Sequence, residues 1–99
     1  MKGPLIYYEI KEMYGTDLSS TKLSRKLKNS ILDDIDLGFD VEIDFKDVRS
    51  ITNGWGRNLI GKIAKEKGTD FVKKHILLSN MNKNVRKTLL EGISDILEV

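Results

Sequence analysis

Short apolar segments alternate with longer amphipathic segments along this chain, and this order is the feature that most constrains its fold. The alternation predicts a largely parallel sheet with right-handed crossovers and helices packed against it. We therefore expect an α/β fold. The predicted strands are residues 5–10, 41–45 and 75–79, and the predicted helices are residues 20–37, 53–67 and 82–97.

Each short segment has a pattern typical of a strand. Residues 5–10 are rich in β-branched and aromatic side chains, which favour strands. Val41–Phe45 alternates apolar and acidic residues with a period of two, which predicts a strand with one buried face. Ile76–Leu78 is an uninterrupted apolar run. Such a run predicts a central strand covered on both faces.

Each longer segment places apolar residues at four-residue intervals, so that they form one stripe on a helix. The stripes are Leu23, Leu27, Ile31 and Ile35, then Trp55, Leu59 and Ile63, then Val85, Leu89, Ile93 and Ile96. Polar residues that can cap a helix precede each stripe. These are Asp17, Ser19, Ser20 and Thr21 for the first helix, Thr52 or Asn53 for the second, and Asn80 or Asn82 for the third.

Length and composition limit the function. The 99 residues suit a single domain, which we assign to residues 1–99. Seventeen Lys and Arg residues nearly balance fifteen Asp and Glu residues, so the chain lacks the strong positive field of nucleic-acid-binding proteins. The chain has no cysteine, and we identify no secretion signal or membrane-spanning run. We therefore expect a cytoplasmic protein with neither nucleic acid nor membrane as a partner.

Three stretches resemble a known family: residues 15–20 (GTDLSS), 41–52 (VEIDFKDVRSIT) and 78–85 (LSNMNKNV). They are similar to uncharacterised bacterial STAS-like domains, which are related to the antagonists of anti-sigma factors. The resemblance implies a single domain with a sheet of four to five strands flanked by helices. It also implies a non-catalytic regulatory role in which the domain docks on another protein, with a histidine-kinase-type ATPase as the candidate partner.

In the better-known relatives, a Ser or Thr at the start of the second helix is phosphorylated, and the phosphate switches partner binding. Here Thr52 stands at the Asp of their Asp-Ser-Ser-Gly pattern, and Asn53 and Gly54 stand at the two serines. Arg57 and Asn58 replace an acidic pair that is common in the uncharacterised branch. The resemblance therefore implies docking through residues 52–58 without the usual phosphorylation switch.

The Gly54-Trp55-Gly56 sequence allows two interpretations. Two glycines in the first turn of a helix cost about 1 kcal/mol each relative to alanine, so something must offset them. Either Trp55 belongs to the core and the glycines allow close packing, or the segment docks on a partner. Both can hold. The predicted partner-binding residues are Ser50, Thr52, Asn53, Gly54, Trp55, Arg57 and Asn58.

Two other function classes remain as alternatives. Residues 56–63 match the phosphate-binding pattern GxxxxGK except that Ile63 replaces the hydroxyl that binds Mg²⁺, so a nucleotide-binding protein or enzyme is one alternative. A self-associating inhibitor encoded by a mobile element is the other.

We expect no catalytic residue, cofactor or metal site. His75 has no partner residues for a metal site, and the acidic residues lack a calcium-loop pattern. These acidic residues are Asp33, Asp34, Asp36, Asp40, Glu42 and Asp44.

Overall fold

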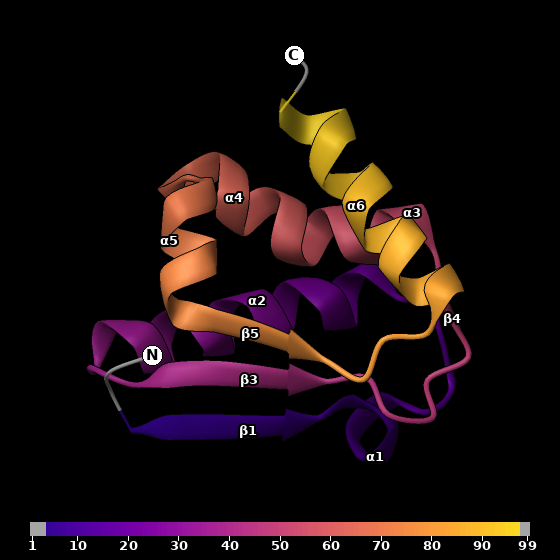
Figure 1. Cartoon of the computed structure of the whole chain (residues 1–99), viewed down its shortest axis with the longest axis horizontal. Coiled ribbons are helices and arrows are strands. Elements are labelled where there is room, and N and C mark those ends of the chain that lie inside the picture. Colours follow the sequence, from indigo (N-terminus) through magenta and orange to yellow (C-terminus); the bar gives the residue numbers. More distant parts are fainter. Residues whose placement is uncertain (1–3, 98–99) are drawn as a thin grey trace.

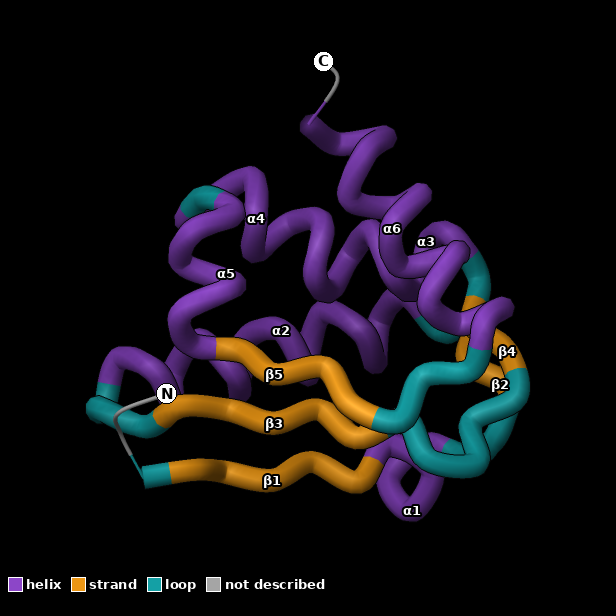
Figure 2. Tube along the Cα trace, viewed as in Figure 1, coloured by secondary structure: helices purple, strands orange, loops and turns teal. Residues whose placement is uncertain are grey.

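The computed structural model of the protein describes the backbone of residues 4–97 and the side chains of residues 4–93. A parallel three-stranded sheet has the order β1–β3–β5, built from Leu5–Glu9, Asp40–Asp44 and Ile76–Ser79. A separate parallel pair joins β2 (Asp17–Leu18) to β4 (Ser50–Ile51). This pair lies beyond the carboxyl ends of the three longer strands (Figure 2).

Helices connect and cover the strands (Figure 1). Their bounds are α1 (Ile10–Tyr14), α2 (Thr21–Asp36), α3 (Asn53–Gly56), α4 (Lys62–Lys67), α5 (Thr69–His75) and α6 (Lys83–Leu97). A π-helical turn, η1 (Arg57–Gly61), joins α3 to α4 without a break, so residues 53–67 form one helical segment. In the described part of the chain, no helix combines the length and the apolar character needed to span a membrane.

The sequence predicts most of these elements. The α/β class, the parallel strands at 41–45 and 75–79 and the three long helices are confirmed within one or two residues. The sheet is smaller than the four to five strands that we expected, because β2 and β4 pair with each other and not with the three-stranded sheet. Two short helices were not predicted. Residue Ile10 begins α1 where the pattern predicts strand, and α5 buries none of its residues and so lacks an apolar stripe.

The prediction that the last strand is central is wrong. Strand β3 occupies the centre of the sheet, and β5 lies at an edge with Leu77 46% exposed. A run of apolar residues indicates that a strand has apolar neighbours, but it does not determine the order of strands. Here Leu77 points to the side of the sheet opposite Leu78, which packs against the core.

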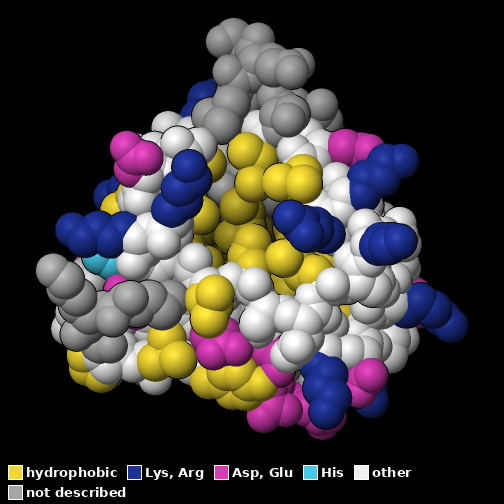
Figure 3. Space-filling model, viewed as in Figure 1, with side chains coloured by type: hydrophobic (Ala, Val, Ile, Leu, Met, Phe, Trp, Pro, Cys, Tyr) yellow, Lys and Arg dark blue, Asp and Glu magenta, His cyan; other side chains and the backbone are white. Residues whose placement is uncertain are grey.

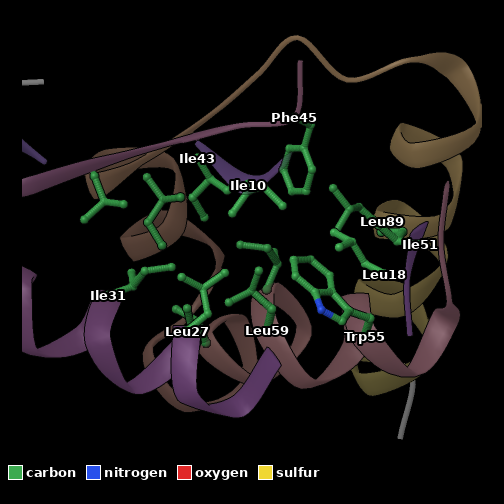
Figure 4. Packing of buried hydrophobic residues seen from close by; sticks show 14 of the residues in the cluster. Ile10, Leu18, Leu27, Ile31, Ile43, Phe45, Ile51, Trp55, Leu59 and Leu89 are labelled. Carbon is green, nitrogen blue, oxygen red and sulfur yellow. The ribbon is translucent and has the colours of Figure 1, made fainter. Parts of the chain in front are cut away.

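The core lies between one face of the sheet and the helices (Figure 4). Val41, Ile43 and Phe45 are fully buried on this face, and the stripes of α2 and of residues 53–67 pack beneath them. The ring of Trp55 meets that of Phe45 edge to face, with centroids 6.2 Å apart. The hydroxyl of Ser24, on α2, donates to the Trp55 carbonyl at 2.6 Å. These contacts attach the start of α3 to both the sheet and α2.

A crossing of two glycines holds α6 against the segment formed by α3 and η1. A Cβ added at Gly92 would lie 3.0 Å from the Arg57 nitrogen, and one added at Gly56 would lie 3.3 Å from a Leu89 methyl group. The helices therefore approach so closely that their backbones are nearly in contact. This finding supports the packing interpretation of Gly56, whose nearest neighbour is Leu89 of α6, with Ile51 of β4 also in contact at 3.6 Å.

We expect Gly92→Val to lower the free energy of unfolding by about 1–3 kcal/mol, because its side chain would push against the backbone of η1. The small gain in helix propensity over glycine does not offset such overpacking. Urea denaturation would measure the change. The control is Glu91→Val on the exposed side of the same helix, which should cost only a few tenths of a kcal/mol. Equal effects of the two substitutions would contradict the close crossing.

Candidate functional site

Two helices begin side by side at the end of the β2–β4 pair. The strands pair in parallel with Leu18 opposite Ile51, and the Thr52 amide donates to the Leu18 carbonyl at 2.9 Å. Just after the strands, Ser20 caps α2 and Thr52 caps α3, each by accepting a backbone N–H at 3.2 Å. We call residues 50–58 the helix-start surface. Its position is set by the neighbouring strand and by α2.

An ion pair beside this surface ties β2 to the chain that enters β4. The Asp17 carboxylate accepts from both Nε and Nη2 of Arg49, with the Nε contact at 3.0 Å, and from the Ser50 hydroxyl at 2.7 Å. The Arg49 guanidinium, followed by the Ser50 hydroxyl, holds the pKa of Asp17 well below its usual value. Ser50 is therefore engaged within the protein, and its hydroxyl supports the turn before Thr52.

The predicted helix cap is confirmed at Thr52, whose side-chain oxygen accepts from the Trp55 amide. Asn53 follows as the first residue of α3 and is exposed. Gly54 comes next and is half-buried against α2, where an added Cβ would lie 3.3 Å from the Thr21 methyl group. The positions that match the two serines of the relatives are therefore an exposed amide side chain and a glycine in contact with α2.

Trp55 contributes to the core and very little to the surface. Its side chain is only 1% exposed, packed against Phe45, and it also forms one wall of a cavity of about 100 Å³. That cavity lies between the starts of α2 and α3 and is lined also by Tyr14, Asp17, Leu18, Ser19, Ser20 and Leu23. A partner would therefore meet Trp55 only through this opening.

The remaining predicted residues lie in the π turn. The side-chain amide of Asn58 donates to the Gly54 carbonyl at 2.8 Å, so Asn58 stabilises the helix start. Arg57 is exposed and faces outward, where it lines a cavity of about 470 Å³ with Lys62, Lys65 and Glu66. The structure thus brings Thr52, Asn53 and Arg57 to the surface, while Ser50 and Asn58 also have structural roles.

The near match to a phosphate-binding loop does not form a loop. Residues 56–63 lie within the continuous helical segment, and Leu59, Ile60 and Ile63 are fully buried in the core. The Gly56 and Gly61 backbones have ordinary helical angles. A phosphate-binding loop requires backbone N–H groups that point at the ligand, whereas a helix interior uses them in its own hydrogen bonds.

Sequence reasoning missed a polar cluster at the carboxyl end of β3. The buried Asp44 carboxylate accepts hydrogen bonds from the Tyr7 hydroxyl, from the Asn80 amide at 2.9 Å and from the Lys46 backbone N–H at 2.8 Å. Burial raises the pKa of Asp44, but these three hydrogen bonds outweigh it and hold the pKa below its usual value. The bond to Asp44 is also the main cause that raises the pKa of Tyr7 to about 12.

The cluster borders an open cavity of about 240 Å³. Its lining residues are Tyr7, Glu9, Ile10, Lys11, Glu12, Asp44, Lys46 and Asp47. Asp47 and Asn80, in the loops after β3 and β5, both have positive φ angles, which Asp and Asn adopt more readily than most residues. The alternation of residues 41–45 predicts that Asp44 leaves the core face. However, nothing in the sequence links it to Tyr7 or Asn80.

His75 and most of the acidic residues singled out from the sequence have structural partners. Nδ1 of His75, the last residue of α5, lies 2.8 Å from Asp40, and Glu42 accepts from Ser79 at 2.7 Å. The Tyr8 hydroxyl donates to Asp34. Among the residues whose side chains are described, no three His, Cys, Asp or Glu residues are arranged to hold a metal ion. These acidic residues do not form one solvated face, because Asp40 and Asp44 are buried.

Comparison with known proteins identifies a family. The model of a family described as a STAS-like domain of unknown function (DUF4325) matches residues 24–86, which is more than half of the chain. The matched range contains β3, the helix-start surface and β5. No curated protein and no solved structure matches the chain.

We expect Arg49→Gln to raise the pKa of the Asp17 carboxyl toward the ordinary value of about 3.9, because the guanidinium is the main cause of its depression. A folded-state pKa below the unfolded value stabilises the protein at neutral pH, and this contribution is lost as the pH falls through the lowered value. Carboxyl-carbon NMR titration would measure the pKa. Lys67→Gln removes one positive charge at the far end of α4 and should leave the Asp17 titration unchanged. An unchanged midpoint in Arg49→Gln would contradict the pairing.

Proposed function

Because the chain belongs to the family of STAS-like domains of unknown function, we propose that it is a non-catalytic regulatory module that binds another protein through the helix-start surface. The observation that carries this proposal is the exposure of Asn53 at the start of a helix. The residues around Asn53 are held in place by hydrogen bonds and by packing in the core. Thr52 caps the helix, Asn58 holds the Gly54 carbonyl, and Trp55 is anchored in the core. A surface that is already ordered loses little conformational entropy when it binds a partner.

The chemistry of this surface favours constitutive binding. A phosphate would add close to two negative charges and three acceptor oxygens at the start of a helix. Neither Asn53 nor Gly54 can accept one. The nearby hydroxyls of Thr52 and Ser50 are engaged, one with the Trp55 amide and one with Asp17. Phosphorylation of either would disrupt a contact that orders the surface, so the proposed module binds without the switch.

We propose a histidine-kinase-type ATPase as the partner, with the module acting in the cytoplasm. This assignment rests on the relatives that the sequence resembles. The surface itself supports a polar partner, because its exposed side chains are the Thr52 hydroxyl, the Asn53 amide and the Arg57 guanidinium. An acidic side chain of the partner would suit the first turn of α3, whose backbone N–H groups carry partial positive charge.

Asn53→Asp should lower the affinity for the partner by roughly tenfold, which corresponds to about 1.4 kcal/mol, by placing a fixed charge where relatives carry phosphate. Folding should be retained, because an acidic residue is favourable in the first turn of a helix. Quantitative mass spectrometry of proteins captured from a lysate of the native host by wild-type and variant bait would measure the loss.

The matched control is Asn84→Asp, which makes the same change at an exposed position in the first turn of α6. We expect one protein, an ATPase of the proposed class, to be retained by wild type and by Asn84→Asp but depleted with Asn53→Asp. Equal retention by all three baits would contradict docking through the helix-start surface.

The protein isolated from its native host should carry no phosphate on residues 50–54, because the acceptor positions of relatives hold Asn53 and Gly54. Intact-mass spectrometry followed by peptide mapping would test this expectation. Substantial phosphate on Ser50 or Thr52 would show that a switch exists at a neighbouring position, and the proposal of constitutive binding would then be wrong.

A further inference from the structure

Among the described residues 4–97, the helices leave one face of the three-stranded sheet largely uncovered. Side chains of a strand alternate between faces, so the strand register divides the sheet into two sets. One set packs toward the helices and comprises Ile6, Tyr8, Val41, Ile43, Ile76 and Leu78. The other set, which we call the open face, comprises Leu5, Tyr7, Glu9, Asp40, Glu42, Asp44, Leu77 and Ser79.

Apolar side chains on the open face are exposed in the described structure. Leu5, Tyr7 and Leu77 are 47%, 49% and 46% exposed, although a leucine or tyrosine on a parallel strand is normally covered. Tyr7 and Leu77 flank Glu42 in a single row across the three strands. Figure 3 shows apolar and acidic side chains interspersed over this part of the molecule. Parallel sheets occur almost only with both faces covered, so this face lacks a layer.

The charge of the open face is negative. Its strand residues include four carboxylates, Glu9, Asp40, Glu42 and Asp44, and no lysine or arginine. Asp40 and Asp44 are buried and bonded within the protein, so the carboxylates that a partner would meet are the exposed Glu9 and the half-buried Glu42. The cavity at its carboxyl end adds Glu12 and Asp47 and also two cations, Lys11 and Lys46, so carboxylates still outnumber cations. The whole chain has a net charge of +2, which means that this face departs in sign from the rest of the protein.

We propose that the open face binds a basic amphipathic helix of a partner protein, with the apolar side of the helix on Leu5, Tyr7 and Leu77 and its Lys or Arg residues near Glu9 and Glu42. A helix is the element that ordinarily covers a parallel sheet, and about 12 residues extend about 18 Å, the length of a five-residue strand. The helix would form the second covering layer and complete a three-layer α/β arrangement.

Charge decides between this occupant and a second copy of the chain. Two open faces packed against each other would bring the carboxylates of Glu9 and Glu42 close to those of the other copy. Like charges placed opposite each other across an interface oppose association. A basic helix instead pairs its cations with these carboxylates while it covers the same apolar residues. The open face therefore favours a basic partner over self-association.

This surface is separate from the helix-start surface of the proposed function. The helix-start surface follows the β2–β4 pair, which lies beyond the carboxyl ends of the strands, whereas the open face spans the three strands themselves (Figure 2). A substitution at Asn53 should leave binding at the open face unchanged. The two proposals can thus fail independently.

The experiment uses a peptide of about 18 residues with Leu on one side of the helix and Lys on the other, and a counterpart with Glu in place of Lys. Backbone amide shifts of the ¹⁵N-labelled full chain should change at Leu5, Tyr7, Glu42 and Leu77 when the Leu–Lys peptide is added. The Leu–Glu peptide should bind at least tenfold more weakly. The Leu77→Lys substitution should lower the affinity for the Leu–Lys peptide about tenfold, because it adds a charge of the same sign as the peptide and removes an apolar contact.

Leu90→Lys is the matched control, since Leu90 is 55% exposed on α6, and it should leave the affinity unchanged, as should Asn53→Asp. Thermal unfolding verifies that each variant is folded. If the Leu77→Lys variant does not fold, the Leu5→Lys variant is used in its place. Shifts that map to another surface, or equal affinity for the two peptides, would overturn the proposal. So would sedimentation of the wild type as a dimer that Leu77→Lys dissociates, because the occupant would then be a second copy.

Discussion

The strand order β1–β3–β5 advances across the sheet in one direction, and right-handed crossovers then place the long connecting helices, α2 and the segment at 53–67, on the same face. The rest of the structure depends on this constraint. One face carries the whole apolar core, where Val41, Ile43 and Phe45 are completely buried. The other face is held together by hydrogen bonds between side chains of neighbouring strands. Tyr7 and Asn80 bind Asp44, and Ser79 binds Glu42.

Much of the fold is predictable from the sequence because its signals are local. Spacings of two and four residues identify β3, α2 and the helical segment at 53–67, and Thr52 identifies the start of that segment. The order of strands in the sheet has no such local signal, since the apolar run at 76–78 is compatible with either a central or an edge strand. Likewise, the two-residue strands β2 and β4 are too short for any periodicity.

The candidate sites show the same division. The sequence predicts the helix-start surface because its cap, its glycines and its missing hydroxyls are consecutive residues. It gives no indication that Asp17 pairs with Arg49, or that Tyr7, Asp44 and Asn80 meet, because more than thirty residues separate the partners in each case. Trp55 illustrates the remaining ambiguity. A large aromatic residue beside exposed polar residues suits a docking surface as well as a core, and the packing of Phe45 against it shows that it belongs to the core.

The π turn at Arg57–Gly61 has a consequence for how this helix is compared with others. Its hydrogen bonds connect residues five apart, such as the Lys62 N–H and the Arg57 carbonyl, so that each later residue is rotated by about 100° relative to an uninterrupted α-helix. The rotation places Arg57 over Lys62 and Lys65 at one cavity. In a relative with a regular helix, the residues that face solvent after this point would be offset by one position. An ungapped alignment of the two sequences would therefore assign the basic side of this helix to the wrong residues.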